Sequence, residues 1–211
     1  MTDLNKALSD ITSIRRQIAA STEFRGYGPA TLACTGLFAV AAAAAQAFWL
    51  PAPASSIAAY LGIWIATAFA SATLIAVQMV SRTHRIHSGL ADEMIRMAVE
   101  QFLPAVGAGG LLTFVLVHFV PACCWMLPGI WQVVFALGIF ASCRFLPHPM
   151  AAAGIWYLIT GLFCLSLADS RALSPWAMGI PYAAGQLLVG AILFFNSKEN
   201  SHDLLEDKDE N

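Results

Sequence analysis

Long stretches without a single charged residue restrict the fold of this chain more than any other feature. Six such stretches occur, and each reaches the length of about 18 residues that is typical of a transmembrane helix. They cover residues 29–50, 54–80, 102–120, 122–143, 150–168 and 175–196. The sequence therefore predicts an all-α integral membrane protein with six transmembrane helices.

The composition supports lipid as the solvent of this chain. Hydrophobic residues make up 58% of the sequence and charged residues 11%, against roughly 45–50% and 25% in an ordinary soluble domain. A soluble protein of this length could not bury so much apolar surface. The first apolar stretch begins too late for a removable signal peptide and lacks a cleavage context of small residues. We therefore expect a multi-pass protein of the lipid bilayer.

The distribution of positive charge predicts the orientation. Six spans place both termini on one side of the membrane, and every Lys and Arg except Arg171 falls on that side. By the positive-inside rule, both termini are expected in the cytoplasm and the protein in the cell (inner) membrane. The net charge of −2 says little about partners, because the charge is segregated by membrane side. Binding of nucleic acid is not expected, because no basic patch is interleaved with aromatic residues.

The chain divides into three predicted regions. Residues 1–28 form an amphipathic cytoplasmic helix and a joint, and residues 29–196 form the transmembrane domain with a cytoplasmic loop at 81–101. Residues 197–211 read as an acidic, disordered tail.

A short phrase recurs in the transmembrane domain. It reads "LGIW" at 61–64, "PGIW" at 128–131 and "MGIP" at 178–181. A glycine phrase precedes each copy, and these phrases are "TGLF" at 35–38, "GGLL" at 109–112 and "TGLF" at 160–163. The pattern predicts three helical hairpins that are possible internal repeats about an axis along the membrane normal. Chance matches in a chain rich in Ala, Gly and Leu are the alternative. The centre of such a bundle is a packed core, a ligand cavity or a narrow pore, and the sequence does not choose.

Residues 2–20 carry an apolar stripe on one helical face. Its members are Leu4, Ala7, Ile11, Ile14 and Ile18, at alternating spacings of three and four. We expect this face to dock a partner helix, to lie on the membrane surface, or to pack on the protein's own loop. In that loop, Ser88 is a candidate N-cap of an amphipathic helix over 88–102.

Two groups of residues are weak candidates for a metal site. His118, Cys123 and Cys124 cluster near the outer ends of two spans, and such ligands suit copper or zinc. Adjacent cysteines lack the spacing of familiar sites, however, and a buried Cys behaves as a small apolar residue. His84 and His87 share a helical face in the cytoplasmic loop, but this spacing often arises by coincidence. We therefore expect no metal and no cofactor.

Polar residues within the spans are uncharged. No Asp, Glu, Lys or Arg lies inside a predicted span, which disfavours a proton-coupled transporter. Gln132 and Gln186 follow the recurring phrase and are the residues expected to line any central cavity, although Gln in lipid more often joins helices. No catalytic motif occurs, so an enzyme is not expected.

Two functions fit these features. The first is a non-catalytic sensor, regulator or accessory subunit that acts through cytoplasmic helices, either on a cytoplasmic protein partner or in a homo-oligomer. The second is a channel or facilitator for a small uncharged or weakly polar solute. It predicts a polar cavity along the bundle axis.

Overall fold

The computed structural model describes residues 29–83, 89–143 and 149–209, and within these ranges all regular structure is helical. Six α-helices and three short 3-10 turns follow one another. The α-helices are α2 (Pro29–Trp49), α3 (Ile57–Thr83), α4 (Gly89–Phe119), α5 (Leu127–Ser142), α6 (Met150–Ser166) and α7 (Pro175–Asp209). The turns are η1 (Pro53–Ser55), η2 (Pro121–Met126) and η3 (Ser170–Leu173).

Five helical segments are long and apolar enough to cross a membrane, and the fourth of them joins η2 to α5. These segments are Ala30–Trp49, Ile57–Gln78, Val99–Phe119, Pro121–Ser142 and Pro175–Phe195. The remaining helix, α6, is apolar but has only 17 residues. At a rise of about 1.5 Å per residue it is about 26 Å long, slightly less than a typical hydrocarbon core. The prediction of an all-helical fold is confirmed for the described residues, and five apolar segments could cross a membrane, while a sixth span is not established by length.

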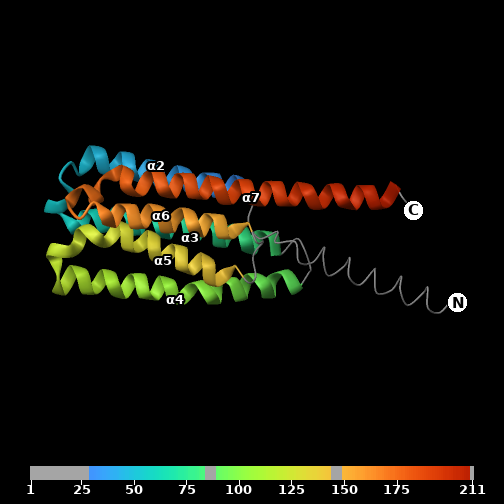
Figure 1. Ribbon diagram of the computed structural model, residues 1–211, viewed down its shortest axis with the longest axis horizontal. Coiled ribbons are helices and arrows are strands. Elements are labelled where there is room, and N and C mark those ends of the chain that lie inside the picture. Colours follow the sequence, from blue (N-terminus) through green and yellow to red (C-terminus); the bar gives the residue numbers. More distant parts are fainter. Residues whose placement is uncertain (1–28, 84–88, 144–148, 210–211) are drawn as a thin grey trace.

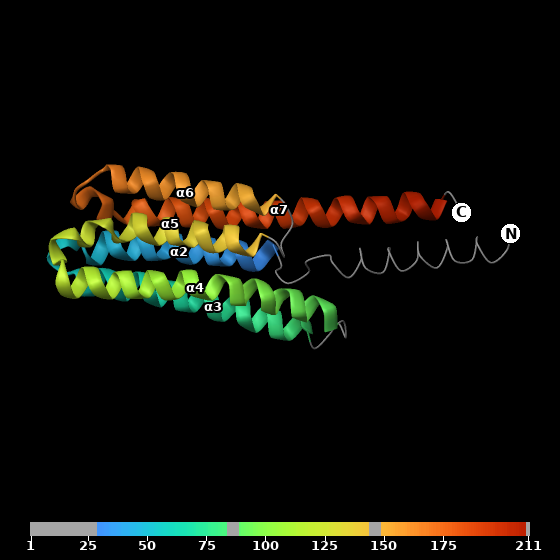
Figure 2. The ribbon, with the colours of Figure 1, turned by 60° about the horizontal axis from the view of Figure 1, so that its bottom comes forward.

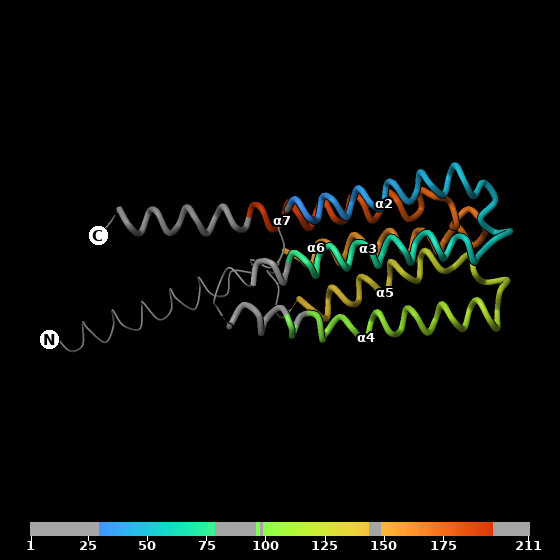
Figure 3. Tube along the Cα trace, turned by 180° about the vertical axis from the view of Figure 1, so that it is seen from behind, coloured from blue at the N-terminus to red at the C-terminus, as the bar shows by residue number. Residues whose placement is uncertain are grey.

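The helices run along the long axis of an elongated bundle (Figure 1). The turns η1, η2 and η3 lie at one end, called here the η end. The start of α2 and the projecting part of α7 lie at the opposite end, called here the terminal end (Figures 1 and 2). Helix α2 packs on α3 and α7, α5 packs on α4 and α6, and α6 packs on α7. Each of α2, α5, α6 and α7 therefore has two main α-helical neighbours. In the view from behind, α2 runs beside α7 and α4 runs beside α5 (Figure 3).

The largest interfaces join helices of different predicted hairpins. They are α2 with α7 and α5 with α6, and both exceed the interfaces within the hairpins. Glycine explains both. A Cβ atom added to Gly129 of α5 would lie 2.8 Å from the carbonyl oxygen of Gly161 of α6. A Cβ atom added to Gly179 of α7 would lie 2.6 Å from Cβ of Ala43 in α2. Only a residue without a side chain permits such close backbone packing, which drives helix association in lipid.

Helices α3 and α4 differ from this closely packed part. Only 11% of the apolar segment of α3 and none of that of α4 is buried. Phe69, Leu111 and Phe114 are exposed, as expected of side chains that face lipid. A Cβ atom added to Gly62 or Gly110 would meet no atom within 4 Å. The side of the bundle formed by α3 and α4 is therefore open, in the sense that most of its side chains are exposed and not packed on another helix.

Helices α4 and α7 continue beyond their apolar segments. Helix α4 begins at Gly89, although its apolar segment begins at Val99, and α7 continues from Phe195 to Asp209. Both extensions lie at the terminal end (Figures 1 and 2). The sequence suggested a disordered tail from residue 197, whereas the structure continues the helix to Asp209. Residues 196–209 contain no Gly or Pro, and their Leu, Glu and Lys residues favour helix.

Candidate functional site: polar contacts inside the bundle

Two of the candidate metal ligands near the η end, His118 and Cys124, contact aromatic rings and a backbone carbonyl. His118 stacks on Phe114, with ring centroids 5.6 Å apart, and contacts the ring of Phe119. The Sγ atom of Cys124 lies 3.7 Å from the carbonyl oxygen of Leu116, and Cys123 is a free thiol. Within the described ranges, no three His, Cys, Asp or Glu side chains form a group that could hold a metal ion.

Several predicted site residues lie outside the described residues. These are the candidate ligands His84 and His87 and the docking residues Leu4, Ile11, Ile14 and Ile18. Ser88, the candidate N-cap, is also outside them. A metal role for the histidines and a docking role for the N-terminal face stay predictions.

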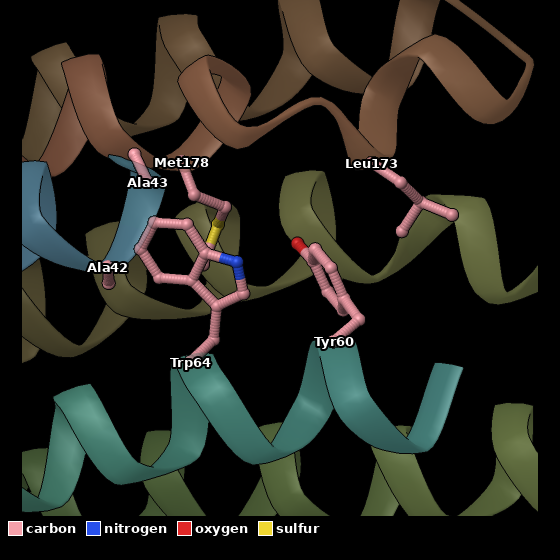
Figure 4. Close-up of a cluster of buried hydrophobic side chains, with 6 residues drawn as sticks. All are labelled: Ala42, Ala43, Tyr60, Trp64, Leu173 and Met178. Atoms are coloured by element: carbon pink, nitrogen blue, oxygen red, sulfur yellow. The ribbon is translucent and has the colours of Figure 1, made fainter. Parts of the chain in front are cut away.

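Gln46 joins three parts of the chain inside the bundle. It is fully buried in α2. Its Nε2 atom donates a hydrogen bond of 2.7 Å to the carbonyl oxygen of Leu173 in η3, and its Oε1 accepts one of 2.7 Å from the indole nitrogen of Trp64 in α3. Trp64 and Tyr60 rise from α3 toward Met178 and Leu173 (Figure 4). A buried amide with both ends bonded holds α2, α3 and the α6–α7 connection together.

The turn that presents Leu173 is held by a charged pair. Asp169 precedes η3, and its Oδ1 accepts a hydrogen bond of 2.8 Å from the backbone N–H of Arg171. Its Oδ2 lies 2.7 Å from Nε of the same arginine. The backbone N–H of Arg171, and then its guanidinium group, lower the pKa of the Asp169 carboxyl. The carboxylate therefore caps η3 at the η end of the bundle.

The recurring phrase has a structural counterpart in its first two copies. The indole nitrogen of Trp131 donates a hydrogen bond of 2.8 Å to Oγ1 of Thr113, and Trp64 donates to Gln46. Each tryptophan lies 18 residues after its acceptor. In both copies the tryptophan thus ties the second helix of a predicted hairpin to the first. In the third copy, Pro181 stands at the tryptophan position.

Pro181 interrupts the hydrogen bonding of α7. Proline has no N–H, so the carbonyl oxygen of Ala177, four residues earlier, has no donor in its own helix. Gln132 of α5 supplies one, because its Nε2 atom lies 2.9 Å from that oxygen. The indole nitrogen of Trp156 in α6 donates to the carbonyl oxygen of Pro181 at 2.9 Å. Neighbouring helices therefore satisfy the backbone at the proline, as the membrane interior requires.

Gln186, the second predicted cavity residue, lies one helical turn beyond this point. Its Oε1 atom is 3.2 Å from Oγ1 of Thr35 in α2, and that hydroxyl donates to the carbonyl oxygen of Leu32. Gln132 is fully buried, and Gln186 is partly buried. Both glutamines contact a second helix, and a role in lining a cavity stays a prediction.

Aromatic rings fill the space around these polar groups. Tyr60 stacks on Trp131 at 6.4 Å between ring centroids, and Tyr157 contacts Tyr182 at 5.2 Å. In the described part of the chain, three buried polar atoms have no hydrogen-bond partner, and these are Tyr60 Oη, Gln132 Oε1 and Tyr157 Oη. An unsatisfied buried group costs about 1–3 kcal/mol. The centre of the bundle therefore holds polar atoms that this arrangement leaves unpaired.

Sequence reasoning missed Trp156, Tyr157 and Pro181 as parts of this site. A usable signal was present, because a proline inside a predicted span frees the carbonyl four residues before it. A glutamine in another span is then a candidate donor. A tyrosine far from the membrane interface is a second signal, because its hydroxyl needs a partner when buried.

Comparison with known proteins gives no relative from which a function could be transferred. No family model matches the chain, and no curated protein or solved structure matches it either.

Proposed function

We propose that this chain is a non-catalytic sensor, regulator or accessory subunit that acts through its cytoplasmic helices. The observation that carries the proposal is the continuity of α4 and α7. Each helix runs unbroken from an apolar segment into an extension at the terminal end. A continuous helix transmits a shift or rotation of its membrane segment to whatever binds its extension.

The proposal includes six membrane spans with both termini in the cytoplasm. Helix α6 is short, but a span needs only about 17–25 residues, and α6 packs between α5 and α7. An even number of spans fits the position of the start of α2 and the end of α7 at the same end of the bundle (Figure 1). The exposed Arg96 of the α4 extension supports the cytoplasmic assignment of that end, because positive charge is retained there.

The polar contacts inside the bundle support a non-catalytic role. Gln46, Gln132 and Thr35 each have a side-chain hydrogen bond to a backbone carbonyl, and the first two reach a different element. These groups join helices, as uncharged polar residues commonly do in membranes.

Capture of a partner from native membranes tests the proposal. The full chain is mildly crosslinked, purified through its C-terminal end and examined by mass spectrometry. The test variant is Ile11→Asp, on the apolar stripe, and the matched control is Ser13→Asp, off the stripe. We expect one stoichiometric partner with the wild type and with Ser13→Asp, and its loss with Ile11→Asp. Absence of a partner from the wild type, or its retention by Ile11→Asp, contradicts the proposal.

The unpaired atoms Tyr60 Oη, Gln132 Oε1 and Tyr157 Oη favour a second function, facilitated passage of a small uncharged or weakly polar solute. Solute flux into liposomes tests it. Under this function, Gln186→Leu abolishes flux and deletion of residues 1–20 leaves it intact. Flux that survives Gln186→Leu contradicts it.

A further inference from the structure

We propose that α7 is hinged at Pro181 and that the side-chain amide of Gln132 holds this hinge straight. The hinge is a property of the bundle alone. Its use in passing a signal to the cytoplasmic end of α7 rests on the function proposed above.

The first support is the backbone gap itself. In the interior of an ordinary helix, each carbonyl accepts a hydrogen bond from the helix itself. At Pro181 the missing bond is replaced by one from Gln132 on α5, at 2.9 Å. Prolines are a main cause of sharp helix bends. The straight form of α7 therefore depends on the position of α5.

The second support is the packing of α7 on the two sides of Pro181. The outer side is the part of α7 toward the η end, and the inner side is the part toward the terminal end. On the outer side, Gly179 packs on Ala43 of α2. On the inner side, Gly185 packs so closely on the hydroxyl of Tyr157 in α6 that a Cβ atom would overlap it, and Gly36 of α2 lies near the backbone of Ala183. Helix α2 thus follows α7 on both sides, whereas α6 meets the inner side at Tyr157. A bend at Pro181 moves the inner part of α7 away from α5 and α6 and carries α2 with it.

The third support is the location of the unpaired polar atoms beside the hinge. The Oε1 atom of Gln132 belongs to the same amide that donates to Ala177, and the unpaired hydroxyl of Tyr157 lies against Gly185. Unpaired atoms raise the free energy of the straight form. A bend separates the surfaces that enclose them and gives them access to partners. Two forms of similar free energy are the requirement for a switch.

Because α7 is long beyond Pro181, a small bend there displaces the far part of the helix by a measurable distance. From Pro181 to Phe195 the helix extends by about 21 Å at about 1.5 Å per residue. A bend of about 20°, typical of a kink at proline, displaces Phe195 by about 7 Å. The displacement is larger still at Asp209, where α7 ends.

Distances between spin labels in lipid nanodiscs test the hinge on the full chain. One label replaces Leu103 of α4 and the other Phe195 of α7, both exposed on the outside of the bundle. The labels are introduced as unnatural amino acids, so that the five native cysteines stay in place. A control pair joins Leu103 to Ile180, an exposed residue on the outer side of the hinge.

The comparison uses two substitutions singly and together. Gln132→Leu removes the donor, and Pro181→Ala restores the N–H that Ala177 needs. We expect Gln132→Leu to broaden the Leu103–Phe195 distance distribution or shift it by several ångströms, and to leave the Leu103–Ile180 distances unchanged. In the Pro181→Ala background, Gln132→Leu is expected to have no such effect. An unchanged distribution in Gln132→Leu overturns the hinge, and so does equal broadening in both backgrounds.

A second measurement covers the case in which Gln132→Leu does not fold. Amide hydrogen exchange over residues 177–185 is compared between the wild type and Pro181→Ala. We expect exchange at least tenfold slower in Pro181→Ala, because the helix is then closed by its own bonds. Equal exchange overturns the hinge. Neither measurement involves a partner, so failure to capture one would count against the proposed function and leave the hinge standing.

Discussion

The bundle has a closely packed half, formed by α2, α5, α6 and α7, and an open half, formed by α3 and α4. The two halves use glycine in different ways. In the closely packed half, Gly129 meets Gly161 and Gly179 meets Ala43 at distances that exclude a side chain. In the open half, Gly62 of α3 and Gly110 of α4 have no neighbour within 4 Å of an added Cβ atom. Glycine in a span therefore permits close approach without causing it, and the shape of the facing helix decides whether the approach occurs.

The two halves are also held by different forces. Backbone packing at glycine holds α5 on α6 and α2 on α7. Hydrogen bonds from tryptophan tie the open half to its neighbours, through Trp64 to Gln46 and through Trp131 to Thr113. Helix α4 is also held at one glycine, because its Phe102 and Ala105 pack on Gly138 of α5. The variants below separate these two modes of attachment.

The largest effect is expected from a side chain at a glycine contact. Gly129→Val places Cβ against the Gly161 carbonyl, a backbone atom that cannot move aside. We expect a loss of about 3 kcal/mol in the free energy of unfolding, the upper range for overpacking. Unfolding in a detergent titration measures it. The control, Gly62→Val, should change the free energy by less than about 0.5 kcal/mol. Equal losses in the two variants would show that the two halves do not differ.

A smaller loss is expected from Gln46→Leu. The substitution leaves the Trp64 indole and the Leu173 carbonyl without their buried partners. We expect a loss of about 2 kcal/mol, because unpaired buried groups keep their full desolvation cost. The same titration measures it, with Thr73→Val as the control, since Thr73 is exposed and bonds only to its own helix. A loss no larger than that of the control would show that Gln46 does not join the halves.

A double-mutant cycle sharpens the comparison for the second tryptophan. Trp131→Phe and Thr113→Val each remove one partner of the 2.8 Å bond, and the double variant removes both. We expect a coupling free energy of about 0.6 kcal/mol, the average for hydrogen bonds between membrane helices. Additive effects of the two substitutions would mean that this bond contributes nothing to the attachment of α4.

Much of the helical framework was predictable from the sequence. Each uncharged stretch is mostly helical, because a membrane interior leaves the backbone few alternatives. The fourth stretch holds η2 and α5, and α4 and α7 extend beyond their stretches. The amphipathic segment before the third span forms the start of α4, although Pro104 lies inside that helix. The choice of neighbours was less predictable. Gly62 and Gly129 occupy the same position in the recurring phrase, yet only Gly129 makes a close contact.

The candidate site was predictable only in part. Gln132 was singled out from its place after the recurring phrase, but its acceptor depends on Pro181, which lies in another span. The partner of Gln46 is a backbone carbonyl in a turn, and no side-chain pattern marks such an atom. Pairings of this kind depend on three-dimensional packing and leave no local trace in the chain.

The smallest effect is expected from Asp169 and depends on pH. The Arg171 backbone N–H and guanidinium lower the pKa of this carboxyl in the folded protein. Its contribution to stability is therefore present above the unfolded value of about 3.9 and is lost as the pH falls through the folded value. We expect the melting temperature to fall slightly more between pH 6 and pH 3 in the wild type than in Asp169→Asn. Equal falls would show that this carboxylate does not stabilise η3.

The hydrogen bond between Gln46 and Leu173 has a consequence for the order in which the protein is made. The two residues are 127 positions apart, and ribosomes add about 5–20 residues per second. Gln46 is therefore synthesised about 6–25 s before its acceptor. During that interval Trp64 is the first of the two native partners of the Gln46 amide to be made. The face of α2 that packs on α7 is uncovered in the same interval. An insertase or membrane chaperone that shields this face would act on α2 and α3 and be released when α7 arrives.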